Sequence, residues 1–180
     1  MMKRWYLAPF SLLYGIGTWF RNVMFNTGLK NKSQPRKATI GVGNLSVGGT
    51  GKSPFVIYLA DILAKKHRTG VLSRGYGRKT KGYMVVNYES FFKTVGDEAM
   101  QLFQRFKNKI VIAVCEDRVF GAKKLIEDMD LDVLILDDAY QHQYIQPGLN
   151  ILLTQYSDPY FKDFILPAGD LRETDRKSVV

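Results

Sequence analysis

Short apolar runs alternate along the chain with stretches in which apolar residues recur at helical spacing. The runs predict buried strands over residues 38–43, 70–73, 110–115 and 131–138. Helical spacing predicts helices from Pro54 to about Lys66 and over Ala99–Phe106. Strands that alternate with helices are typical of a three-layer α/β domain with a mostly parallel sheet, which we expect over residues 36–180.

A different pattern precedes this domain. Residues 5–20 are uncharged and rich in Trp, Tyr and Phe, but they are fewer than the roughly 20 apolar residues of a spanning helix. Aromatic rings favour the membrane interface, and the flanking basic side chains can reach headgroup phosphates. We therefore interpret residues 1–30 as an N-terminal segment with a helix in the interface of the inner leaflet. The alternative is a helix packed on its own domain.

Basic and acidic residues are unevenly distributed, with the excess of basic residues near the N-terminus. Residues 1–60 hold eight basic residues and no acidic one, whereas the remainder holds 18 basic and 17 acidic residues. Such an arm is attracted to nucleic acid or to acidic lipids. The aromatics lie among aliphatic residues and not among the charges, so we favour lipid and expect no nucleic acid. The single cysteine, Cys115, excludes an internal disulfide and lies in an apolar run, which predicts a buried strand residue.

The sequence Asn-Leu-Ser-Val-Gly-Gly-Thr-Gly-Lys-Ser follows the first predicted strand and precedes a predicted helix. That context is the one a phosphate-binding loop requires, although Ser46 stands where the strict pattern has glycine. The glycines let backbone N–H groups face phosphates, Lys52 would reach the β- and γ-phosphates, and the Ser53 hydroxyl would bind Mg²⁺. The predicted nucleotide-binding residues are Gly48, Gly49, Thr50, Gly51, Lys52 and Ser53. The alternative is a glycine-rich turn that binds no ligand.

Further candidates follow other predicted strands and helices. Asp137 ends an apolar strand and, beside a phosphate-binding loop, would hold Mg²⁺, although acidic residues after a strand are also common in plain turns. His142 lies close to Asp137 in sequence. Asp97 precedes a predicted helix, where capping that helix is the simpler interpretation. Arg74 and Arg78 lie on a glycine-rich loop that either grips an anionic substrate or is merely solvated.

These motifs, in this order, resemble the tetraacyldisaccharide 4'-kinase family of lipid A biosynthesis. The resemblance covers essentially the whole chain, and its most specific elements are the Ser-Arg-Gly-Tyr-Gly-Arg loop at 73–78 and Leu-Pro-Ala-Gly at 166–169. The other matching motifs are Pro9–Gly15, Val42–Pro54, Gly96–Glu98, Asp117–Arg118, Leu136–His142 and Asp170–Glu173.

The resemblance implies a peripheral kinase on the cytoplasmic face of the bacterial inner membrane. It would use ATP and Mg²⁺ to phosphorylate the 4'-hydroxyl of an acylated disaccharide 1-phosphate, with no obligate protein partner. Asp97 is implied as the base, with Lys52 and Mg²⁺ offsetting developing charge. Asp137 and Asp138 are implied as metal and active-site carboxylates, with His142 orienting them. The remaining implied site residues are Arg74, Arg78, Arg118, Arg172 and Glu173.

Members of this family are nearly twice as long and have a second α/β lobe after the Leu-Pro-Ala-Gly region. We therefore expect the chain to be the N-terminal half of such a kinase, with impaired activity at 180 residues. The runner-up hypothesis is a membrane-associated P-loop ATPase or GTPase that acts through a protein partner. Two observations weigh against it. Val47 stands where membrane-positioning ATPases have lysine, and the 180 residues lack the Asn/Thr-Lys-x-Asp segment with which GTPases recognise guanine.

Overall fold

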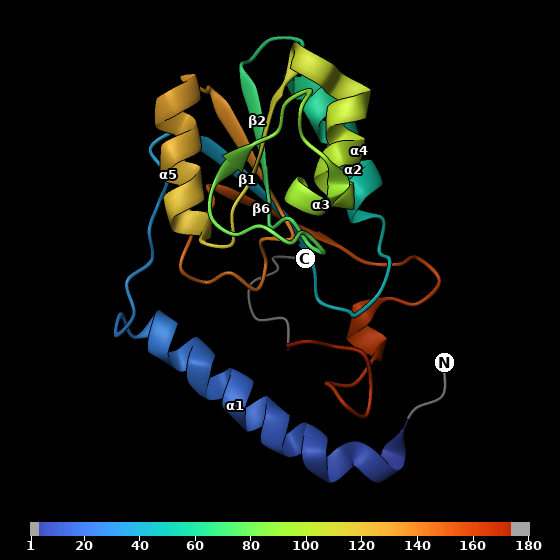
Figure 1. Ribbon diagram of the computed structural model, residues 1–180. Coiled ribbons are helices and arrows are strands. Elements are labelled where there is room, and N and C mark those ends of the chain that lie inside the picture. The colour runs from blue at the N-terminus through green and yellow to red at the C-terminus, as the bar shows by residue number, and fades with distance from the viewer. Residues whose placement is uncertain (1–3, 174–180) are drawn as a thin grey trace. The chain divides into compact units, whose positions relative to one another are not determined.

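The computed structural model describes residues 4–173 (Figure 1). The strands are β1 (Ala38–Asn44), β2 (Thr69–Ser73), β3 (Met84–Val85), β4 (Val111–Val114), β5 (Val133–Asp137) and β6 (Leu149–Leu153). The α-helices are α1 (Ala8–Asn26), α2 (Lys52–Leu63), α3 (Phe92–Val95), α4 (Asp97–Phe106) and α5 (Arg118–Met129). Short 3₁₀ turns cover Trp5–Leu7, Lys107–Lys109 and Tyr160–Lys162.

The strands form one six-stranded sheet in the order β3-β4-β2-β5-β1-β6. Neighbours β1, β5, β2 and β4 are parallel, and β3 pairs antiparallel with β4. The predicted mostly parallel α/β sheet is therefore confirmed. The apolar pattern did not predict β3 and β6. Strand β3 has only two residues, and none of the residues of β6 is fully buried.

Helices cover both faces of this sheet, with α5 on one face and α2 and α4 on the other (Figure 1). Leu125 of α5 is fully buried in a core with Leu72 of β2 and Leu134 of β5. Gly121 lets α5 pack closely on the residue that follows β4, because a Cβ at Gly121 would lie 2.7 Å from the Cβ of Cys115. Cys115 is 1% exposed, which confirms its predicted burial, but it lies directly after β4 and not within the strand, because its backbone N–H is the last to bond to β2, at Ser73.

The chain divides into two compact units. The first contains, among the described residues, 4–32, 44–51 and 152–173, and the second contains 33–43 and 52–151. Most of the sheet and helices α2 to α5 belong to the second unit. Parallel strands place their carboxyl ends at one edge, so Arg74, Arg118 and Asp137 follow or end strands at the same edge of the second unit.

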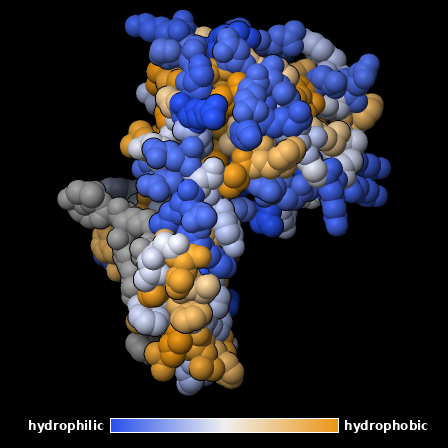
Figure 2. Space-filling model, turned by 90° about the vertical axis from the view of Figure 1, so that its left-hand side faces the viewer, coloured by the Kyte–Doolittle hydropathy of each residue, from blue (hydrophilic) through white to orange (hydrophobic). Residues whose placement is uncertain are grey.

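Helix α1 belongs to the first unit and confirms the predicted N-terminal helix, which extends beyond residue 20 to Asn26. One side of α1 is apolar and exposed. Spacings of three and four residues place Leu12, Leu13, Ile16, Trp19 and Phe20 on one side, and all five are exposed. Hydrophobic residues gather over this part of the molecule in Figure 2. Within residues 4–173, no helix combines the length and apolar character that crossing a bilayer requires.

Candidate active site

The phosphate-binding loop lies in the first unit and has the backbone that its glycines permit. Gly48 has φ 117° and Gly51 has φ 79°, a region that side chains with a Cβ rarely adopt. A Cβ at Gly48, Gly49 or Gly51 would meet no atom within 4 Å, so conformation and not crowding requires glycine at Gly48 and Gly51. The loop therefore exposes its backbone to a ligand, as phosphate binding requires.

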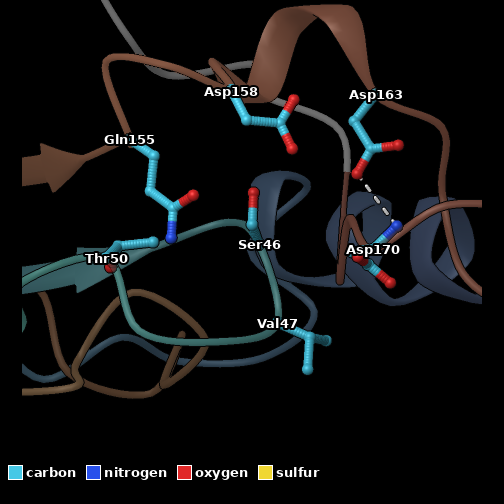
Figure 3. Close-up of a pocket in the computed structure, with 7 residues that line it drawn as sticks. All are labelled: Ser46, Val47, Thr50, Gln155, Asp158, Asp163 and Asp170. Atoms are coloured by element: carbon cyan, nitrogen blue, oxygen red, sulfur yellow. Dashed lines mark hydrogen bonds between the residues drawn. The ribbon is translucent and has the colours of Figure 1, made fainter. Parts of the chain in front are cut away.

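A pocket of about 220 Å³ lies beside this loop in the first unit (Figure 3). Four of the side chains that line it were not predicted as site residues: Gln155, Asp158 and Asp163 lie in no motif, and Asp170 begins the motif at 170–173 without an implied role. Gln155 donates from Nε2 to the Gly49 carbonyl oxygen at 2.7 Å, and Asp163 accepts from the Asp170 backbone N–H. Three carboxylates would repel a phosphate, so we do not assign phosphate binding to this pocket.

Lys52 begins α2 in the second unit, directly after the loop. Its Nζ lies 3.5 Å from Oδ1 of Asp138, and its side chain is only 17% exposed. Asp138 follows β5 with φ 51°, which is uncommon for a residue other than glycine. Strained backbone of this kind is concentrated at functional sites, because surrounding structure must hold it in place. The predicted loop lysine and strand-end carboxylate are thus brought together.

Asp137 is the most strongly perturbed carboxylate of the second unit. Burial, with the added repulsion of Glu98, raises the pKa of Asp137 to about 6, and Arg118 opposes that rise. Glu98, Asp137 and Asp138 are thus like charges in one neighbourhood, which a divalent cation would stabilise. In the described part of the chain, no three His, Cys, Asp or Glu side chains form a metal-binding group. The residues fit Mg²⁺, which is commonly held by one or two carboxylates together with phosphates and waters.

Arg118 begins α5 and is 3% exposed. It donates from Nη1 to the Leu72 carbonyl oxygen at 3.0 Å and from Nη2 to that of Asp137. Burial lowers the pKa of Arg118 to about 10, so it stays charged at neutral pH. The guanidinium therefore fixes the ends of β2 and β5 and adds a positive charge beside Asp137.

His142 shares a cavity of about 430 Å³ with Arg118. Burial and then the charges of Arg118 and Arg74 lower the pKa of His142 to about 4, against a smaller opposing effect of Asp138. The imidazole is therefore neutral at pH 7 and can both donate and accept a hydrogen bond. That state suits the predicted role of orienting a neighbouring carboxylate.

Asp97 is the first residue of α4, and it does not cap that helix as the simpler interpretation expected. Gly96 occupies the cap position with φ 90°, and no side chain bonds to the helix end there. A Cβ at Gly96 would lie 2.7 Å from the Tyr76 carbonyl oxygen, so only glycine allows this close approach. The Asp97 side chain is exposed and has no capping role.

The predicted substrate arginines lie in different environments. Arg74 is exposed, whereas the Arg78 side chain is 2% exposed and its Nη2 lies 2.7 Å from Glu116 Oε1. In the first unit, Arg172 donates its backbone N–H to the Leu45 carbonyl oxygen, and Glu173 is buried against Arg21. Arg74 is thus open to solvent, while Arg78 and Glu173 are engaged in ion pairs within the protein.

Comparison with known proteins shows the family of the chain. A sequence model described as tetraacyldisaccharide-1-P 4'-kinase matches residues 3–179. The chain belongs to the tetraacyldisaccharide-1-P 4'-kinase family. The 4'-kinases of Cytophaga hutchinsonii and Flavobacterium johnsoniae are similar to it, with 47% and 43% identity over 93% of the chain. A crystal structure of LpxK from Aquifex aeolicus in complex with ATP is similar over 96% of the chain, with 41% identity and a TM-score of 0.86.

The relatives in this family are longer than the chain. It spans 48% of the Cytophaga 4'-kinase, 49% of the Flavobacterium one and 55% of the Aquifex LpxK chain. The chain thus spans about half the length of the relatives that it matches.

Proposed function

We propose that the chain is the nucleotide-binding part of a kinase that transfers the γ-phosphate of ATP to the 4'-hydroxyl of tetraacyldisaccharide 1-phosphate. One observation carries the proposal: Lys52 follows a glycine loop and reaches Asp138 beside the buried Asp137. A lysine and a metal-binding carboxylate in this arrangement are the parts that P-loop phosphoryl transfer uses. Similarity to an LpxK that was crystallised with ATP supports the choice of nucleotide.

Each residue then has a role. Lys52 neutralises charge on the β- and γ-phosphates. The Ser53 hydroxyl and Asp137 would hold Mg²⁺, which would supply further positive charge to the phosphates. Asp97, exposed at the start of α4, accepts the proton of the attacking hydroxyl. The neutral His142 orients Asp138, and the exposed Arg74 attracts the anionic substrate.

The kinase is also proposed to work at a membrane surface, as a peripheral protein on the cytoplasmic face of the inner membrane. The exposed apolar side of α1, which includes Leu12, Ile16 and Phe20, supports this location. A helix with one apolar side and basic residues near its ends suits the interface, where its substrate's acyl chains also reside.

Nucleotide binding and transfer can be tested separately. Lys52→Ala removes a charge-assisted contact to phosphate, so we expect MgATP affinity to fall at least about tenfold in calorimetric titration. Lys66→Ala, which changes an exposed lysine just beyond the other end of α2, should leave affinity unchanged. Asp97→Asn should retain MgATP affinity but lose phosphate transfer to the lipid when expressed in the full-length enzyme. Wild-type transfer rates in Asp97→Asn would refute its assignment as the base.

Membrane docking has its own readout. Trp19 is 49% exposed on the apolar side of α1. With Trp5→Phe, Trp19 is the only tryptophan, and its emission should shift to the blue when vesicles of phosphatidylglycerol and phosphatidylethanolamine are added. Ile16→Ser should weaken this response, whereas Asp61→Ser, at an exposed position of α2, should not. An unshifted spectrum at saturating lipid would contradict docking through this side of α1.

A further inference from the structure

The side of α1 that faces away from its exposed apolar stripe is bonded to residues 165–173 of the same unit. Ser11 donates from Oγ to the Ile165 carbonyl oxygen at 3.0 Å and accepts from the Ala168 backbone N–H at 2.9 Å. Farther along the helix, Tyr14 Oη donates to the Arg172 carbonyl oxygen at 2.9 Å. Arg21 Nη2 lies 2.9 Å from Glu173 Oε2. Three turns of α1 thus contact one short segment.

The same segment supports the beginning of the phosphate-binding loop. The Arg172 backbone N–H donates to the Leu45 carbonyl oxygen at 2.8 Å, and the Val47 backbone N–H donates to that of Asp170 at 2.8 Å. Between these two bonds, Ser46 and Leu171 form an antiparallel bridge. Residues 45–47 therefore have their backbone fixed by 170–172, and this segment bonds in turn to residues 163–166 and, at Arg172, to Tyr14 of α1.

The Arg21–Glu173 ion pair joins α1 to the last residue of the 165–173 segment. The Glu173 side chain is 4% exposed, and its Oε1 has no hydrogen-bond partner in the described residues. A buried carboxylate that loses its cation is strongly unfavourable, so it must move toward water or take up a proton. Either response shifts a residue next to Arg172, whose backbone holds Leu45. The ion pair is thus in a position to control the loop without contacting a nucleotide.

We propose that Glu173 is a positioning residue: paired with Arg21, it holds residues 170–172 in place, and through them α1 orders the start of the phosphate-binding loop. This assigns Glu173 a role different from the substrate contact that the family resemblance implies. The proposal deepens the proposed function and rests on it for its consequence, because docking α1 on a membrane then affects the nucleotide site. The coupling itself needs only the contacts of the first unit.

Hydrogen–deuterium exchange of the unliganded chain tests the coupling directly. Arg21→Gln and Glu173→Gln should each raise amide exchange in residues 45–47 at least about fivefold, because the Val47 N–H loses its fixed acceptor. Exchange in β4 should not change, which separates the effect from general destabilisation. The double variant should exchange no faster than the faster single variant, as expected of two partners in one interaction. Arg4→Gln removes the same charge from an exposed side chain at the beginning of the helix region and should match wild type.

Two smaller changes to the same contacts, Tyr14→Phe and Arg21→Lys, test whether the effect on residues 45–47 is graded. Tyr14→Phe removes one hydrogen bond to Arg172 and should give a smaller increase at 45–47, while Arg21→Lys should partly restore wild-type exchange. Wild-type exchange at 45–47 in both Arg21→Gln and Glu173→Gln would overturn the proposal. MgATP affinity of the same variants should fall in proportion to the loss of protection. If the loop responds but wild-type chain binds no MgATP, the coupling stands and the proposed kinase function fails.

Discussion

Replacing Asp137 by asparagine should reveal how much the metal-free fold is destabilised by its own site. Asp137 is 3% exposed and lies at the end of β5 near Glu98, Asp138, Arg118 and Lys52. Burial and the two neighbouring carboxylates favour the protonated form of Asp137, and the two basic residues favour the ionised form. The first effect is larger, so the pKa of Asp137 is raised to about 6. The isosteric Asp137→Asn variant removes the charge and keeps the shape.

The size of the effect follows from the difference in proton affinity. The pKa of Asp137 rises from 3.8 in the unfolded chain to about 6 in the folded one. At about 1.4 kcal/mol for each tenfold difference, ionised Asp137 destabilises the fold by about 3 kcal/mol near pH 7.5. Because the folded state binds the proton more tightly, this penalty decreases as pH falls through 6. It should be about 1 kcal/mol near pH 4.5.

Urea unfolding in the presence of EDTA measures this penalty for wild type and Asp137→Asn at both pH values. The cost of a buried amide does not depend on pH, so the change in the stability difference isolates the charge. The free energy of unfolding of the variant minus that of wild type should be about 2 kcal/mol larger near pH 7.5 than near pH 4.5. His142 titrates in both proteins and cancels. A stability difference that stays constant with pH would refute the electrostatic account of this site.

Three further outcomes are expected. Gly121→Ala should lower the free energy of unfolding by about 1–3 kcal/mol, because its Cβ would overlap Cys115, whereas Gly17→Ala in α1 should be neutral or stabilising in urea unfolding. Burial raises the pKa of the Cys115 thiol, so Ellman's reagent should react with it only after unfolding, and rapid reaction of the native chain would contradict its burial. Burial also raises the pKa of Tyr83 to about 12, so stability should decrease between about pH 10 and 12, and Tyr83→Phe should remove that decrease.

The second unit could largely be predicted from the sequence, because its information is local. Four apolar runs correspond to β1, β2, β4 and β5, and the spacing after Ser53 corresponds to α2. Such strands and helices are encoded by residues within about a dozen positions of one another. The glycine loop and the carboxylates at the end of β5 are also contiguous motifs. Within the second unit, a parallel sheet brings the ends of β1 and β5 to one edge, which agrees with the contact between Lys52 and Asp138.

The first unit could not be predicted in the same way, because its contacts join distant positions. Nothing near Glu173 indicates that its partner is Arg21, and no motif marks Gln155 as the side chain that holds Gly49. Arg78 shows the same difficulty at shorter range: two arginines on one loop look alike in sequence, but one is buried with Glu116 and the other is exposed. Burial depends on which loops meet, and residue type alone does not determine that.

The support of the phosphate-binding loop has a consequence for synthesis of the chain. Residues 45–47 leave the ribosome about 120 residues before residues 170–172, which fix their backbone. At roughly 5–20 residues per second, this interval lasts about 6–24 s. Throughout that time α1 has neither its buried partner Glu173 nor any other contact from residues 165–173. If α1 docks on a membrane as proposed, its apolar side is available to the bilayer before residues 45–47 gain the segment that fixes them.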